Sequence, residues 1–360
     1  MQNRQSHIDV FKIIASQLIV LHHFASYGPI ADAASLTAPG MTGWLYDYAR
    51  MAVQVFLVIG GYLAAQSLAS PARASNSMLW RVIARRYQRL ILPLLAALLL
   101  SVAVAALVRP MFGIDADFIP ARPGWAQVLA HMLLIQSIVG SDALSAGVWY
   151  VAIDFQLFVL MVCLMWPGRR YRWWQPVARI LVLALMLASL FYFNRNEDWD
   201  NWALYFFGAY GMGVAACWTA QSKRPGLLLA LLMLVGLCAL TLAFRERIVI
   251  ALCVALLLGI LQRQGTPFAL HAALARPLAA LGQASYALFL VHFPVLMLAN
   301  ALFQQGKWTQ PWVAAAILLG SVVTSNALAL LFARQVEAPL SHWRRHSAGV
   351  EFNTDKAAGT

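Results

Sequence analysis

The sequence predicts an all-α, polytopic membrane protein with about ten transmembrane helices. Hydrophobic residues make up 61% of the 360 residues, charged residues only 11%, and the mean hydropathy is +0.69. Soluble domains carry about 25% charged residues, so a soluble fold of this length would lack the charges needed to cover its surface. The apolar residues also fall in runs of roughly the 20 residues that cross a bilayer as a helix.

Ten apolar segments can be recognised along the chain, and each is expected to be a helix. Lipid offers no hydrogen-bonding partner to the backbone, so a spanning segment is either a helix or part of a closed barrel. The strict alternation of barrel strands is absent. Residues 1–340 are therefore expected to form one membrane domain, and residues 341–360 a polar cytoplasmic tail. The predicted spans are residues 8–28, 46–68, 90–108, 147–166, 176–193, 202–219, 226–243, 248–262, 278–302 and 312–333.

The distribution of basic residues predicts the orientation. If the N-terminus is cytoplasmic, the inner segments and their span ends hold 18 of the 26 basic residues, and the outer loops hold six. Cytoplasmic segments of membrane proteins are enriched in Lys and Arg in this way. Both termini are therefore expected in the cytoplasm, and the longest loop, residues 109–146, on the outer side. This topology explains most of the net charge of +12 without nucleic acid as a partner.

The first span carries ionisable residues that are costly in lipid and are therefore candidates for function. Lys12 and His23 are eleven residues apart, which on a helix is three turns plus about 20°, so both side chains point the same way about 16 Å apart. His22 is rotated by about 100° and is expected to face elsewhere. Imidazole titrates near neutral pH, so His23 is a candidate general base. The alternative is that Lys12 reaches the interface and the histidines bond between helices.

Asp154, about two turns into the fourth span, is the second unusual residue. A carboxylate there is expected to be protonated or paired, with Lys12 or His23 as its partner. It is a catalytic candidate, and the alternative is a structural ion pair.

A basic stretch with Arg85, Arg86 and Arg89 precedes Pro93 on the expected cytoplasmic side. These three arginines lie near one face of a helix. They are expected to bind either lipid headgroups or a phosphate-rich cytosolic cofactor, since guanidinium matches phosphate geometry.

Weaker signals mark other polar positions within the spans. The polar side chains at the outer end of the second span and in the ninth span are candidate substrate-binding residues, and for His292 in the ninth span a packing role is the alternative. No metal site is expected, because the four cysteines are scattered singly in apolar runs. Motifs of zinc proteases, P-loop NTPases, dinucleotide-binding folds and serine hydrolases are absent from the sequence. The candidate substrate-binding residues are Arg50, Gln54, Tyr286 and His292.

Five segments together resemble the acyltransferase-3 family of membrane O-acyltransferases. The resemblance covers most of the chain and follows the family order on ten spans. Lys12 stands where that family usually has Arg, and Asp154 where it usually has Glu. The similar segments are residues 8–23 (ID…K…H), 53–63 (VQVFLVIGGYL), 149–156 (WYVAIDFQ), 281–294 (LGQASYALFLVHFP) and 336–339 (VEAP).

The resemblance implies transfer of an acyl group, often acetyl, from cytoplasmic acyl-coenzyme A to a carbohydrate hydroxyl. The acceptor would be a surface or secreted polysaccharide or a glycolipid, and the location the bacterial inner membrane. The arginine cluster would hold the coenzyme, His23 would act as general base, and Lys12 would hold the coenzyme arm. Two other classes fit a cavity lined by such residues, a proton-coupled solute transporter and a flippase for a lipid-linked sugar.

Overall fold

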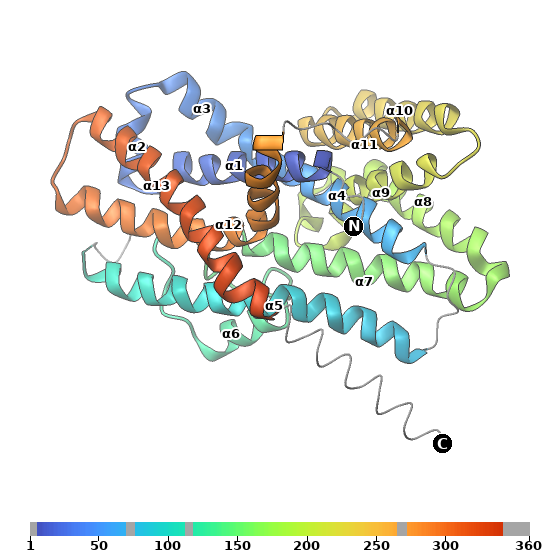
Figure 1. Cartoon of the computed structure of the whole chain (residues 1–360), viewed down its shortest axis with the longest axis horizontal. Helices are drawn as coiled ribbons and strands as arrows, with labels where there is room; N and C mark the ends of the chain where they lie inside the picture. Colours follow the sequence, from blue (N-terminus) through green and yellow to red (C-terminus); the bar gives the residue numbers. More distant parts are fainter. Residues whose placement is uncertain (1–5, 70–75, 112–117, 265–271, 341–360) are drawn as a thin grey trace, which may run out of the picture.

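The computed structural model describes residues 6–69, 76–111, 118–264 and 272–340, and these residues form helices and connections without a strand (Figure 1). Each predicted span corresponds to a long helix, which confirms the all-α class. The predicted tail, residues 341–360, lies outside the described residues. The long helices are α1 (Ser6–Ser26), α4 (Val53–Leu68), α5 (Asn76–Val108), α7 (Val148–Arg170), α8 (Gln175–Phe191), α9 (Ala203–Ala220), α10 (Pro225–Leu242), α11 (Glu246–Gln264), α12 (Ala272–Gln305) and α13 (Pro311–Phe332).

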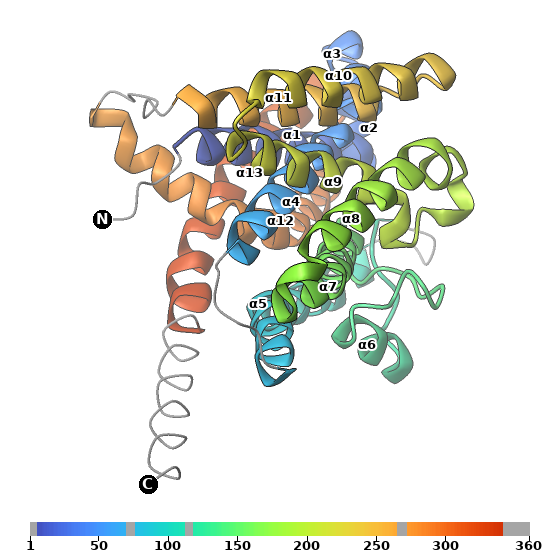
Figure 2. The same cartoon turned by 90° about the vertical axis from the view of Figure 1, so that its right-hand side faces the viewer.

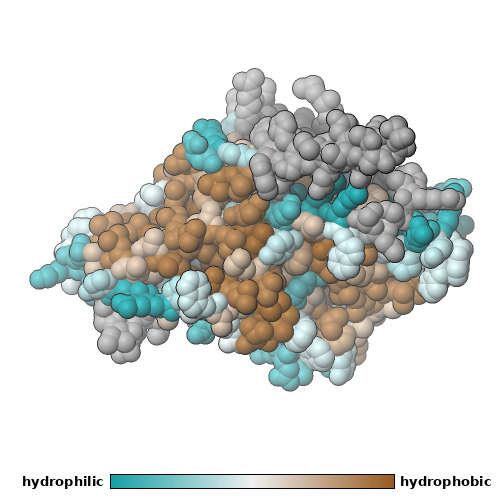
Figure 3. Space-filling view, turned by 90° about the horizontal axis from the view of Figure 1, so that it is seen from below, coloured by the Kyte–Doolittle hydropathy of each residue, from teal (hydrophilic) through white to brown (hydrophobic). Residues whose placement is uncertain are grey.

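Within the described residues, nine helices are long and apolar enough to cross a membrane. Helix α11 is the predicted span that is not among these nine. Large apolar side chains are exposed on several helices, for example Leu99 (73%) and Val323 (70%). Figure 3 shows one face on which such residues form broad apolar areas. The chain is therefore an integral membrane protein.

Helix α5 is longer than the span predicted at residues 90–108, because the helix already begins at Asn76. Arginine and leucine are good helix formers, so the basic stretch continues the apolar helix instead of ending it. Pro93 lies within this helix, where it lacks the N–H that would bond the carbonyl one turn earlier. The arginine cluster is thus built into the first half of a single long helix.

Helices α4 and α9 meet at glycines on both sides. A Cβ atom on Gly61 would lie on the carbonyl oxygen of Tyr210, and one on Gly213 would lie on the carbonyl oxygen of Val58. Small residues let transmembrane backbones approach this closely. Any side chain at either glycine would therefore push the two helices apart.

The long loop predicted on the outer side folds against α5. It contains a short helix, α6 (Trp125–Met132), which Figure 1 shows below α5. The Tyr87 hydroxyl of α5 donates to the Met132 carbonyl at 2.6 Å. His131 is fully buried; its Nδ1 donates to the Gln127 carbonyl at 2.8 Å and its Nε2 accepts the Leu144 N–H at 3.2 Å. A neutral imidazole in one tautomer thus ties the loop together.

Helix α12 packs along α1, and two short helices follow α1: α2 (Pro29–Ser35) and α3 (Pro39–Asp47). Figure 2 shows α2 and α3 close together at the same side of the bundle. Asn300 of α12 accepts the Ile30 N–H at 3.1 Å and donates to the Tyr27 carbonyl at 3.3 Å. Gly28, between them, has a positive φ of 83°, which glycine adopts without strain. One asparagine therefore fixes the turn that ends α1.

Candidate active site

His23 of α1 faces His292 of α12 in the interior. His23 is 8% exposed and His292 is fully buried. The Nδ1 atom of His23 lies 2.6 Å from Nε2 of His292. The rings are nearly parallel, with centroids 4.9 Å apart and an angle of 13° between planes. Two residues 269 positions apart in the chain thus form one imidazole pair.

The hydrogen bonds of this pair assign a tautomer to each ring. His292 Nδ1 lies 3.1 Å from the Leu288 carbonyl oxygen, which only accepts, so Nδ1 carries the proton. In the neutral ring the other nitrogen of His292 is then an acceptor. His23 Nδ1 must donate to it, which leaves Nε2 of His23 with its lone pair. His23 is therefore held in the tautomer that can accept a proton at Nε2.

Tyr27 lies beside the histidine pair. Its ring stands edge-on to His23 at 5.7 Å, and its other side packs edge-on against Phe293 at 5.7 Å. Asn300 holds the backbone of Tyr27 as described above. No sequence pattern marks Tyr27 or Asn300 as functional, since neither lies in an unusual pattern of charges.

His22 points away from the pair, as the helix geometry predicts. Its Nδ1 lies 3.1 Å from the Leu45 carbonyl oxygen in α3, and its ring is 6.3 Å from that of Tyr46. The two adjacent histidines thus serve different neighbours. Lys12 lies in the first half of the same uninterrupted helix, where its side chain is half-buried.

Asp154 of α7 pairs with Arg86 of α5, which corrects the expected pairing with Lys12 or His23. Arg86 Nη2 lies 2.5 Å from Asp154 Oδ2, and the side chains are 26% and 9% exposed. Helices α5 and α7 pack side by side, and this contact brings the two charges together. The sequence shows where charges occur along the chain, but not which helices become neighbours.

Three tyrosine hydroxyls lie close enough to this ion pair to interact with its charges. Tyr150 comes from α7, Tyr210 from α9 and Tyr286 from α12. The guanidinium of Arg86 also lies over the Phe158 ring, 5.3 Å from its centroid. The ion pair is therefore the centre of a buried polar cluster that joins four helices.

Comparison with known proteins decides the family. The profile of a family described as "Acyltransferase domain" matches residues 6–330, nearly the whole chain. The chain belongs to the acyltransferase-3 family. Regulator of hypoxia-inducible factor 1 from Caenorhabditis elegans is 24% identical over 164 residues. This match covers 42% of the chain and 32% of the relative, so the chain matches about a third of that protein's length. No solved structure matches the chain.

In this acyltransferase-3 chain the three arginines of the basic stretch have different surroundings. Arg85 and Arg89 are exposed on α5, whereas Arg86 turns inward to Asp154. One residue step on a helix rotates a side chain by about 100°, which separates Arg86 from the other two. Arg86 thus has a structural role as the partner of Asp154. The exposed Arg85 and Arg89 remain the candidates for binding the phosphates of a cofactor.

The four candidate substrate-binding residues of the acyltransferase-3 chain do not form one group. His292 has both ring nitrogens hydrogen-bonded and lies behind His23. The Tyr286 hydroxyl donates to the Leu90 carbonyl of α5 at 2.9 Å. Gln54 is buried in α4, and Arg50 is exposed in the turn before α4. Of these four, Arg50 is therefore the side chain most open to a large substrate.

Proposed function

We propose that this protein is a membrane O-acyltransferase that moves an acetyl group from cytoplasmic acetyl-coenzyme A to a carbohydrate hydroxyl. The observation that carries the proposal is the hydrogen-bond order from Leu288 through His292 to His23. This order leaves Nε2 of His23 free to accept a proton. The family to which the chain belongs is described as an acyltransferase domain. A buried histidine held in one tautomer by a second group suits general-base catalysis.

The proposed reaction is a direct transfer. The acceptor hydroxyl oxygen attacks the thioester carbonyl while Nε2 of His23 takes the hydroxyl proton. The carbon–sulfur bond then breaks, the acetyl ester forms, and the departing thiolate of coenzyme A takes the proton from His23. His292 keeps His23 in the correct tautomer throughout, and Lys12 holds the thioester arm on its way to His23.

Arg85 and Arg89 are proposed to bind the phosphates of the coenzyme. Both are exposed near the start of α5, and guanidinium groups pair well with phosphate oxygens. This end of α5 lies on the cytoplasmic side in the orientation that the charge distribution predicts. The proposed location is the inner membrane of a bacterium, with a surface or secreted glycan or a glycolipid as acceptor.

Binding of acetyl-coenzyme A to the purified protein tests the proposal. A transporter or a sugar flippase has no reason to bind the coenzyme, whereas an acyltransferase must. Transfer of labelled acetyl from the coenzyme to membrane glycans as an alkali-labile ester is the second readout. Absence of both binding and transfer would overturn the proposed function.

The arginine assignment has its own test. Arg85→Ala should raise the Michaelis constant for acetyl-coenzyme A and leave turnover nearly unchanged, as expected for a lost uniform-binding contact. Arg172→Ala is the matched control, because Arg172 is an exposed arginine in the turn between α7 and α8. Equal effects of both substitutions would indicate a general charge effect instead of a phosphate site.

A further inference from the structure

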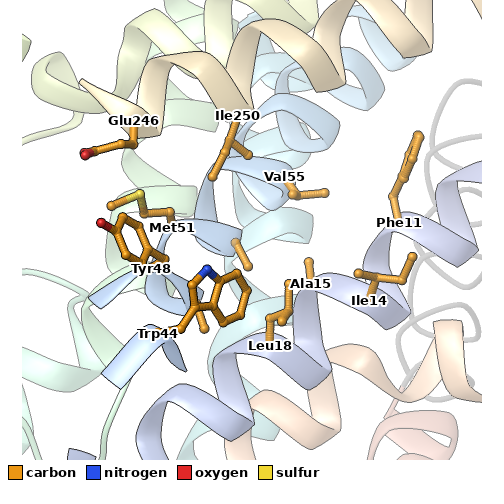
Figure 4. A pocket seen from close by; sticks show the side chains of 12 residues that line it. Phe11, Ile14, Ala15, Leu18, Trp44, Tyr48, Met51, Val55, Glu246 and Ile250 are labelled. Carbon is orange, nitrogen blue, oxygen red and sulfur yellow. The ribbon is translucent and has the colours of Figure 1, made fainter. Parts of the chain in front are cut away.

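An apolar groove of about 330 Å³ runs between α1, the turn before α4, and α11 (Figure 4). This volume falls within the range of small-molecule sites. Its walls are almost entirely apolar, and Ile14 and Trp44 on its rim are about half exposed (53% and 50%). In a membrane protein a groove with such an open apolar rim is accessible to hydrocarbon chains.

The α1 wall of the groove leads directly to the histidines. Phe11, Ile14, Ala15 and Leu18 line it, and they recur every three or four residues on one face of α1. The next position of this face is His22. The His22 and His23 rings are neighbours, with centroids 5.2 Å apart. A molecule whose chain lay in the groove would therefore have its head group beside the histidines.

The end of the groove nearest α3 carries the polar groups of its lining. Glu246 of α11 and Tyr48 line this end (Figure 4). Arg50 lies in the adjoining turn and is not one of the side chains that line the groove. The Glu246 carboxylate disfavours a phosphate head group at this end, because like charges repel. Sugar hydroxyls both donate and accept hydrogen bonds, so they match this mixture of groups.

We infer that the groove binds the hydrocarbon chain of a glycolipid, whose sugar head group lies at Glu246 and Tyr48, near His22 and His23. The inference names the acceptor class of the proposed transfer and so rests on the proposed function. Binding in the groove, however, can be measured without any acyl transfer.

The test uses the full-length protein in phosphatidylcholine vesicles and a long-chain alkyl glucoside that carries a photoreactive diazirine on its chain. Mass spectrometry of the labelled peptides should place the label on groove residues of α1 and α11. Excess unlabelled alkyl glucoside should remove the label, and excess phosphatidylglycerol should not. Label spread over all lipid-facing helices, or displaced equally by phosphatidylglycerol, would overturn the inference.

A matched pair of variants sharpens the test. Ile250→Trp fills the groove and should remove most of the label, whereas Ile260→Trp places the same change on an exposed position of α11 outside the groove. If Ile250→Trp fails to assemble, the labelling pattern of the unchanged protein still shows whether the glycoside binds in the groove. Normal labelling without acetyl transfer would refute the proposed function alone, and normal transfer with label elsewhere would refute the groove alone.

Discussion

His23 and His22 are adjacent, yet their imidazoles have different partners, and this difference predicts their roles. His23→Ala removes the proposed general base, which typically contributes 10²–10⁴-fold to a rate. His22→Ala removes contacts to α3 and to the neighbouring His23 ring but no proposed proton acceptor, so it should retain most of the activity. The measurement is acetyl transfer by the two variants at matched amounts of membrane-inserted protein. Normal transfer by His23→Ala would exclude imidazole at this position as the base.

His292 is a positioning residue in the proposed mechanism. His292→Leu removes the acceptor for His23 Nδ1–H and should lower kcat while also changing the pH profile of transfer. His292→Gln retains an amide oxygen able to accept that hydrogen bond, so it should recover part of kcat and the original profile. A residue needed only for packing would give the same pH profile in both variants, and that outcome would contradict the assigned role.

For single residues, the sequence indicates which side chains belong to the site but does not indicate which side chains they contact. His23 and His292 could both be selected, because buried ionisable groups in apolar spans are rare. Their hydrogen bond could not be foreseen, since no periodicity connects positions 269 residues apart. Charge alone places Arg86 with Arg85 and Arg89, and only the packing of α5 on α7 shows that it turns to Asp154.

At the level of elements, the Arg86–Asp154 ion pair joins α5 to α7. Asp154→Ala leaves Arg86 as a largely buried unpaired charge, and breaking such a pair costs about 3 kcal/mol. The double variant Arg86→Met with Asp154→Leu removes both charges and should be more stable than either single change. The thermal unfolding midpoint of the solubilised protein measures this. Arg85→Met, next in the chain but exposed, is the control and should leave the midpoint unchanged.

The loop around α6 should loosen in mild acid. Burial lowers the pKa of His131 below its ordinary value, and the hydrogen bond to Gln127 opposes this only in part. A lowered pKa means that the neutral ring stabilises the fold fully above about pH 6.5. This contribution is lost as the pH falls through the lowered pKa, because protonated Nε2 can no longer accept the Leu144 N–H.

Limited proteolysis between α5 and α7 provides the measurement. Cleavage in this loop should increase as the pH falls below about 6.5. His131→Phe cannot titrate, so its cleavage should vary much less with pH. A pH dependence that persists unchanged in His131→Phe would assign the effect to another group.

The helices themselves could largely be predicted, because runs of apolar residues report directly on what lipid requires. All ten predicted spans are helices. The ends of the helices are predicted less well. Helix α5 extends through the basic stretch back to Asn76, because the composition changes there but the helix propensity does not. Residues 109–146 are predicted only as a long outer loop, and their sequence carries no information about the packing of α6 on α5.

For the whole molecule, the charge distribution predicts that both termini are cytoplasmic. Reporter fusions at the C-terminus should give cytoplasmic signals, and fusions within residues 118–147 should give signals from the outer side. Neutralising a few arginines should not reverse the protein, because 18 basic residues favour the same side. A cytoplasmic signal from this loop would reverse the assignment of Arg85 and Arg89 to a cytosolic ligand.

The contact between Gly61 and Tyr210 has a consequence for how the protein is made. These residues are about 150 positions apart, so at roughly 5–20 residues per second a ribosome needs about 7–30 s between them. During this interval α4 enters the bilayer with its glycine face covered only by lipid or by the insertion machinery. Helix α9 must then reach α4 after several other helices have left the ribosome. The close backbone contact between α4 and α9 thus forms only after α5, α7 and α8 have been made, and before α10 to α13 are complete.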